Sequence, residues 1–135
     1  MLEVKPVRDT SEQKAACEAC GIAYLPGHFV YGATEDGALV GASLFDITGE
    51  GAVVEAIRPA PGSENDYEGL FILGRGTLNF LDLCGVKQAV MRVHDETDTR
   101  LSHILGFRDD GTGTLRLSLV GLFDADCAAK KKEEP

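Results

Sequence analysis

Residues 66–85 constrain the fold more than any other stretch, because their apolar positions recur at the spacing of a mostly buried helix with a narrow polar stripe. Asp66 can accept hydrogen bonds from the free N–H groups of the first turn, and Gly85 stands where a left-handed C-terminal residue is needed. We expect Gly74 and Gly76, inside the helix, to mark close packing against neighbours. The residues expected to face the core are Tyr67, Leu70, Phe71, Leu78 and Leu81, flanked by Leu73, Phe80 and Cys84.

Two short apolar runs flank this helix. Residues 52–57 precede it and residues 87–93 follow it, with Pro59, Pro61 and Gly62 in the loop before the helix. Strand, helix, strand is the order of a βαβ unit, whose two strands lie parallel in one sheet. In such units a ligand often binds at the loop where the first strand leads into the helix. The function of the chain therefore depends mainly on that loop.

The rest of the chain predicts further strands and two shorter helices. Thr10 and Gln13 have the spacing of a capping box, and Gly21 should end the helix that begins there. The three strands before the long helix should form an antiparallel meander, with a turn at Asp36 and Gly37. We therefore expect an α/β (α+β) fold with a mixed, mostly antiparallel six- or seven-stranded sheet flanked by helices. The remaining strands are expected at residues 2–7, 28–34, 38–47, near Phe107 and at 114–122, and the last helix at 97–105.

The composition is that of one globular domain. The chain has 135 residues, of which 44% are hydrophobic and 26% charged. We assign residues 1–127 to a single domain and 128–135 to a charged C-terminal tail. No apolar run approaches the roughly 18 residues of a membrane span, and the N-terminus lacks an apolar signal core, so we expect a cytoplasmic protein that does not bind membranes. A net charge of -9 would repel a phosphate backbone, which argues against binding to nucleic acid.

Four cysteines raise the question of a metal or redox site. Cys17 and Cys20 form a C-x-x-C pair, but they lie within a helical pattern. Cys84 and Cys127 are distant in sequence and belong to no second pair or histidine cluster. We therefore expect no metal site, and we expect reduced thiols that pack as small apolar groups. A metal or redox role is the alternative.

The predicted order β-α-β-β-β-α-β-α-β-β and three short motifs resemble the GNAT superfamily of acyl-CoA-dependent N-acetyltransferases. The motifs are D-G-A-L-V-G at residues 36–41, I-R-P at residues 57–59 and L-S-H-I-L-G-F at residues 101–107. By the order of its elements, the resemblance covers nearly the whole chain. It implies transfer of an acetyl group from acetyl-CoA to an amine.

The resemblance also implies an acyl-CoA site at the loop before the long helix, where backbone N–H groups and the helix dipole would bind the diphosphate. The family signature R/Q-x-x-G-x-G/A falls on residues 64–69, where only the last glycine matches. Glu64, Asp66 and Glu68 bring three carboxylates to this site, and helix capping explains them without a ligand. The cofactor-binding residues that the resemblance implies are Ile57, Arg58, Gly62, Asp66 and Gly69.

Amide formation needs a base for the ammonium proton and an acid for the leaving thiolate. The resemblance implies Glu55, on the strand before the loop, as the base. The alternative is that strand alternation turns this carboxylate to solvent. The family's acidic tyrosine corresponds to Ser102, whose hydroxyl is a poor acid, and His103 is the neighbouring imidazole. Glu55, Ser102 and His103 are therefore the catalytic candidates.

Two functions stay open. One is a divergent N-acetyltransferase that acts on a small-molecule or peptide amine. The other is a non-catalytic GNAT-like domain with a degenerate active site, which has lost its acyl-CoA site and binds a small ligand or a partner protein. The order of elements favours the first and the incomplete signature favours the second. The sequence leaves both a monomer and a homodimer open.

Overall fold

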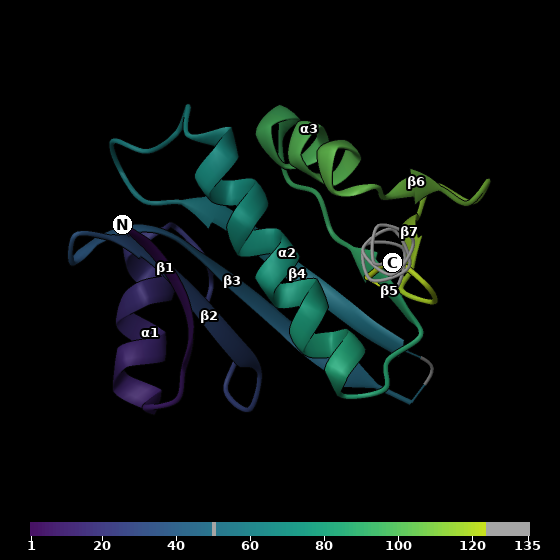
Figure 1. Cartoon of the computed structure of the whole chain (residues 1–135), viewed down its shortest axis with the longest axis horizontal. Helices are drawn as coiled ribbons and strands as arrows, with labels where there is room; N and C mark the ends of the chain where they lie inside the picture. The colour runs from purple at the N-terminus through teal and green to yellow at the C-terminus, as the bar shows by residue number, and fades with distance from the viewer. Residues whose placement is uncertain (50, 124–135) are drawn as a thin grey trace, which may run out of the picture.

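The computed structural model describes residues 1–49 and 51–123, which form one sheet with helices on both faces (Figure 1). The chain alternates between strands and helices in the predicted order. Its elements are β1 (Leu2–Val7), α1 (Thr10–Ala19), β2 (Phe29–Glu35), β3 (Ala38–Thr48), β4 (Gly51–Pro59), α2 (Tyr67–Leu83), β5 (Gln88–Met91), α3 (Glu96–Leu105), β6 (Arg108–Asp109) and β7 (Leu115–Ser118).

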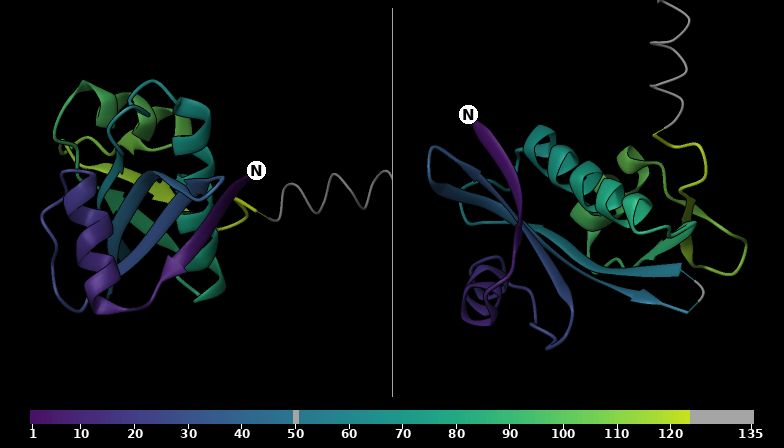
Figure 2. Two further views of the ribbon diagram at one scale, coloured as in Figure 1. Left: turned by 90° about the vertical axis from the view of Figure 1, so that its left-hand side faces the viewer. Right: turned by 60° about the horizontal axis from the view of Figure 1, so that its bottom comes forward.

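The sheet has seven strands in the order β1-β2-β3-β4-β5-β7-β6. β4 and β5 are parallel, and every other neighbouring pair is antiparallel. The expected fold class, a mixed and mostly antiparallel sheet flanked by helices, is confirmed. α2 and α3 cover one face of the sheet, and α1 covers the other (Figure 2). Among residues 1–49 and 51–123, no helix has the length and apolarity to cross a membrane.

α2 begins and ends where the sequence predicts. The Asp66 carboxylate accepts a hydrogen bond from the N–H of Gly69, and Gly85 follows the helix with a left-handed φ of 84°. Gly74 and Gly76 are close-packing positions, as expected: an added Cβ would lie 2.7 Å from Leu105 and 2.8 Å from Val4, respectively. α2 is therefore held tightly against both α3 and the first strand.

The buried face of α2 is shifted slightly from the predicted one. Leu70, Leu78 and Leu81 are fully buried, and so is Leu73, which we expected at the flank. Tyr67 and Phe71 are only partly buried, and Cys84 is exposed. The difference arises because the helix contacts α3 as well as the sheet, so that its apolar stripe faces two partners rather than one.

Three local expectations are wrong. The helix α1 is capped by Asp9, whose carboxylate accepts from the N–H of Glu12, and not by Thr10. Gln13 instead donates through Nε2 to the carbonyl of Val7. The last strand ends at Ser118 because the chain turns at residues 120–123, and β5 is shorter than the predicted strand. The predicted charged tail lies outside the described residues.

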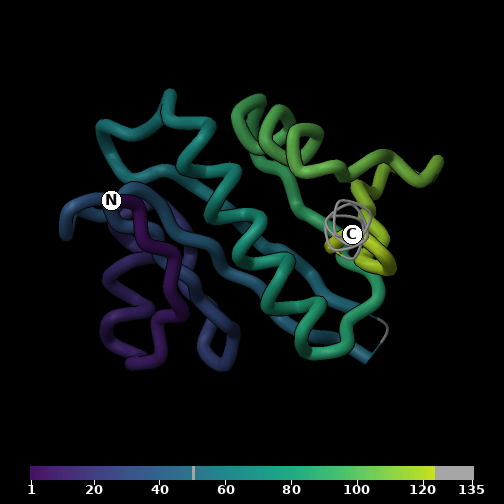
Figure 3. The backbone as a smooth tube through the Cα atoms, in the orientation of Figure 1, coloured from purple at the N-terminus to yellow at the C-terminus, as the bar shows by residue number. Residues whose placement is uncertain are grey.

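β4 and β5 run side by side over only part of their length (Figure 3). Their register pairs Ala52 with Ala89 and ends at Val54 with Met91. β4 stays paired with β3 as far as Pro59. Within residues 1–49 and 51–123, the edge of β4 that faces β5 therefore has no strand partner beyond Val54, and this divergence positions the candidate site.

Candidate functional site

A cleft of about 420 Å³ lies where β4 separates from β5. The first residue after the paired segment, Arg92, still donates its N–H to the carbonyl of Val54 at 2.9 Å. In the part of the chain that the structure describes, no further backbone pairing joins the two strands after this bond. The cleft is lined by Gly21, Ile22, Ala23, Leu25, Leu44 and Ala56, which are small or apolar, and by Glu55, Arg58 and His94.

Glu55 reaches this cleft because β4 contains a β-bulge. The register with β3 pairs Leu44 with Ala56 and Phe45 with Val54, so Glu55 is the extra residue. The carboxylate is 21% exposed and forms an ion pair with Arg92 Nε at 2.9 Å. The alternative of a carboxylate turned to solvent by simple alternation is therefore wrong, since Val54 and Ala56 pack into separate core clusters around the bulge.

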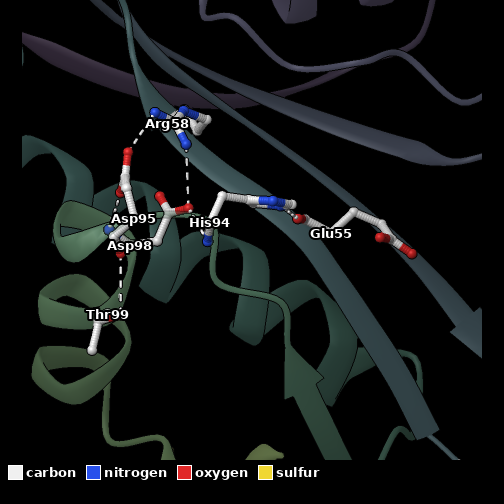
Figure 4. Close-up of polar contacts among 6 residues, drawn as sticks. All are labelled: Glu55, Arg58, His94, Asp95, Asp98 and Thr99. Atoms are coloured by element: carbon white, nitrogen blue, oxygen red, sulfur yellow. Dashed lines mark hydrogen bonds and ion pairs between the residues drawn. The ribbon is translucent and has the colours of Figure 1, made fainter.

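His94 crosses the opening between the strands (Figure 4). Its Nε2 lies 3.1 Å from the carbonyl oxygen of Glu55. That oxygen can only accept, so Nε2 donates the proton. No chemical role was predicted for His94 from the sequence. The signal that could have pointed to it is its position directly after the predicted strand 87–93.

Arg58 is neutralised by two carboxylates at the start of α3. Its Nη2 lies 2.8 Å from Asp95 Oδ2, and its Nη1 lies 3.2 Å from Asp98 Oδ2 (Figure 4). The backbone N–H of His94 also donates to Asp98 Oδ2. The guanidinium that the resemblance assigned to acyl-CoA therefore already has two anionic partners within the chain.

Asp98 is the most deeply buried of these charged groups. Its side chain is 1% exposed, and its Oδ1 has no hydrogen-bond partner in the part of the chain that the structure describes. Burial raises the pKa of Asp98, whereas the N–H of Asp98 lowers the pKa of Asp95 by hydrogen bonding to its carboxylate. The surroundings therefore favour the protonated form of Asp98 and the ionised form of Asp95.

Between β4 and the first turn of α2, carboxylates of the chain accept from two glycine N–H groups. The carboxylate of Glu64 accepts from the N–H of Gly62 at 3.0 and 2.9 Å, which lowers the pKa of Glu64. Asp66 accepts from Gly69 at 2.9 Å, and a Cβ at Gly69 would lie 2.5 Å from Asp66 Oδ2. Gly69 therefore makes room for the capping carboxylate. Side-chain carboxylates therefore occupy the N–H donors of Gly62 and Gly69, which disfavours an anion at these two positions.

The remaining predicted site residues do not line the cleft. Ile57 is buried in the main core. Ser102 is fully buried, and its hydroxyl donates to the carbonyl of Thr99 at 2.7 Å. His103 is exposed on α3. The structure thus brings Glu55 and Arg58 together with His94, and it leaves Ser102 and His103 outside the cleft.

The cysteines of α1 are packed as apolar groups. Cys17 and Cys20 are buried, and Cys84 is exposed; all three are free thiols. Burial raises the pKa of Cys17, and it raises the pKa of Cys20 to about 11. In residues 1–49 and 51–123, no group of three or more His, Cys, Asp or Glu side chains could hold a metal ion. Cys127 lies outside the described residues.

The rate of alkylation should differ between the buried and the exposed thiols. At pH 8 only about one Cys20 side chain in a thousand would be a thiolate, the reactive form. We therefore expect iodoacetamide to modify Cys84 rapidly and Cys17 and Cys20 slowly in the folded protein, as followed by peptide mass spectrometry. Protein in urea, where all three should react at similar rates, is the control. Rapid modification of Cys20 in the native protein, or one equivalent of zinc per chain, would contradict the structural role.

Comparison of the sequence with family models and with curated proteins gives no match. Comparison of the structure with solved structures gives many matches. The spermidine/spermine N-acetyltransferase SpeG from Vibrio cholerae matches with a TM-score of 0.72 at 11% identity, over 92% of this chain and 96% of that chain. The ribosomal-protein-S18-alanine N-acetyltransferase from Escherichia coli matches with a TM-score of 0.68 at 14% identity, over 88% and 94%.

A third match is an E. coli protein, the putative N-acetyltransferase YhhK, solved in complex with coenzyme A. It has a TM-score of 0.64 and 16% identity, over 87% of this chain and 98% of that chain. These matches cover nearly the full length of both partners. The chain therefore has the GNAT acetyltransferase fold, as the order of its elements predicted.

Proposed function

We propose that the chain is an N-acyltransferase that transfers an acyl group, with acetyl-CoA as the expected donor, to a small-molecule or peptide amine in the cleft lined by Glu55, Arg58 and His94. One observation carries the proposal: a carboxylate, Glu55, and an imidazole, His94, line the same mostly apolar cleft. The fold supports it, since similar solved structures are N-acetyltransferases and one of them holds coenzyme A.

In this reaction the amine nitrogen bonds to the thioester carbonyl carbon, and the bond from that carbon to sulfur breaks. An ammonium group must first lose a proton, and the Glu55 carboxylate is the acceptor. Arg92 orients this carboxylate through the ion pair at 2.9 Å. The leaving thiolate takes its proton from solvent, because Ser102 and His103 do not line the cleft and the N–H of His94 Nε2 is already donated to the carbonyl of Glu55.

Turnover tests the proposal directly. The protein is incubated with acetyl-CoA and a panel of primary amines, and free coenzyme A and acetylated amine are measured together. The expected result is equal amounts of both products, above a control without amine that reports thioester hydrolysis. Absence of any amine-dependent thiol release, with acetyl-CoA failing to raise the melting temperature, would contradict the proposal.

A non-catalytic GNAT-fold domain is the second candidate, and one observation favours it. The N–H donors of Gly62 and Gly69, at the expected diphosphate site, are bonded to the carboxylates of Glu64 and Asp66. These carboxylates both fill the donor positions and repel an anion. Under this alternative the cleft binds a small ligand or a partner protein without group transfer.

Neutralising the two carboxylates should improve binding of acetyl-CoA. We expect the double variant Glu64→Gln, Asp66→Asn to bind about tenfold more tightly than the wild type by calorimetry, because two like charges near the diphosphate are removed. The amide introduced by Asp66→Asn can still cap α2 through its side-chain oxygen, so the fold is preserved. The gain should shrink as salt approaches 1 M, where screening acts over about 3 Å. Micromolar binding by the wild type that the substitutions leave unchanged would contradict this repulsion.

A further inference from the structure

A second and larger cavity, of about 590 Å³, lies at the end of β1 and the start of β2. Among the described residues, it shares no lining residue with the cleft that contains Glu55, Arg58 and His94. The segment between α1 and β2 separates the two: Ala23 and Leu25 line the cleft, whereas Tyr24 and Pro26 line this cavity. We refer to it as the β1–β2 pocket. Its volume is in the usual range for small-molecule sites.

Aromatic rings form one wall of the β1–β2 pocket. Phe29 and Tyr31 point to the same side of β2, and Phe80 reaches them from α2, with ring centroids 5.4 Å from Phe29 and 5.6 Å from Tyr31. Phe29 is 38% exposed even though it packs against these rings. The exposed part of this cluster is an apolar surface of tilted rings, against which an aromatic ring of a ligand can pack edge-to-face or offset-stacked.

Another part of the pocket lining is polar and fixed by hydrogen bonds. The hydroxyl of Tyr24 donates to Gln13 Oε1 at 2.7 Å, and Gln13 Nε2 donates to the carbonyl of Val7 at 2.7 Å. These bonds tie the loop after α1 to α1 and to the end of β1. The pocket is thus held in shape without a ligand, which lowers the cost of binding.

The charges around the β1–β2 pocket are unlike those of the chain as a whole. The protein has 22 acidic and 13 basic residues, yet among residues 1–49 and 51–123 the pocket lining includes Arg8 and His28 and no carboxylate. In the part of the chain that the structure describes, neither of these side chains forms an ion pair or a hydrogen bond, so the Arg8 guanidinium has no anionic partner there. Arg8 lies close enough to Tyr31 to oppose the rise in its pKa that burial and Cys84 cause.

We infer that the β1–β2 pocket binds a small carboxylic acid with a flat apolar body, such as an arylacetate. The ring would lie against Phe29, Tyr31 and Phe80, and the carboxylate would pair with Arg8, beside His28. Arg8 can bond both oxygens of a carboxylate, which fixes the orientation of the ligand. This site is independent of the acyl-transfer reaction, since it uses none of the residues of the cleft.

Three probes of similar shape test the inference: phenylacetate, phenylacetamide and phenethylamine, titrated into ¹⁵N-labelled protein. We expect phenylacetate to bind with a dissociation constant of about 1 mM, as is typical of so small a ligand. The amide and the amine should bind at least about tenfold more weakly, because they lack the charge-assisted bond to Arg8. The resonances that move should include those of Tyr24, His28 and Tyr31.

Two variants of equal charge provide the control. Arg8→Gln should weaken phenylacetate binding about tenfold and leave phenylacetamide binding within about twofold. Lys14→Gln removes the same charge from α1 at an exposed position outside the pocket, so it should change neither. Melting temperatures of both variants verify the fold. Equal binding of the acid and the amide, no effect of Arg8→Gln, or shifts confined to the residues of the cleft would each overturn the inference.

Discussion

Replacing Leu78 by Ala is expected to lower the free energy of unfolding by about 2–5 kcal/mol. Leu78 is 0% exposed and belongs to the core cluster shared by α2, α3 and the sheet. The cavity left by the substitution cannot collapse easily, because Gly74 and Gly76 already bring α2 to close contact with Leu105 and Val4. Urea denaturation, followed by circular dichroism, measures the change.

Leu83→Ala is the matched control, since it makes the same change on the same helix. Leu83 is 78% exposed, so its truncation should alter the free energy of unfolding by less than about 0.5 kcal/mol. Equal effects of the two substitutions would mean that α2 buries a different face.

The parts of the fold that depend on local pattern were predictable. The caps of α2, the close-packing role of Gly74 and Gly76 and the crossover from β4 to β5 follow from residue types at fixed spacing. The cap of α1 was not predicted correctly, because the carboxylate of Asp9, one residue before Thr10, accepts the hydrogen bond from the first turn.

The candidate site depends on contacts between distant residues, which no local pattern reveals. Arg58 is 40 residues from Asp98 in the sequence, and His94 is 39 residues from Glu55. The bulge that directs Glu55 toward the cleft is a property of the register between β3 and β4, not of either strand alone. The carboxylates beside the glycine N–H groups of the β4–α2 loop were predictable, because they are close neighbours in the sequence.

Replacing Glu55 by Gln should reduce the rate of acyl transfer by about 10² to 10⁴, the usual contribution of a positioned base. The amide has nearly the same shape as the carboxylate but cannot take up the ammonium proton. Amine-dependent release of coenzyme A measures the effect. Glu12→Gln is the control, since Glu12 is exposed on α1 and does not line the cleft, and its activity should match the wild type.

Arg92→Gln distinguishes a base from a structural carboxylate. If Glu55 served only to form the ion pair with Arg92, breaking the pair from either side would have the same effect. If Glu55 is the base, Arg92→Gln leaves a carboxylate in the cleft and should lose less than about tenfold, far less than Glu55→Gln. Equal losses in the two variants would mean that Glu55 is not the base. Among the described polar residues of the cleft, the one without an ion pair would then be His94, whose Nε2 donates to the carbonyl of Glu55.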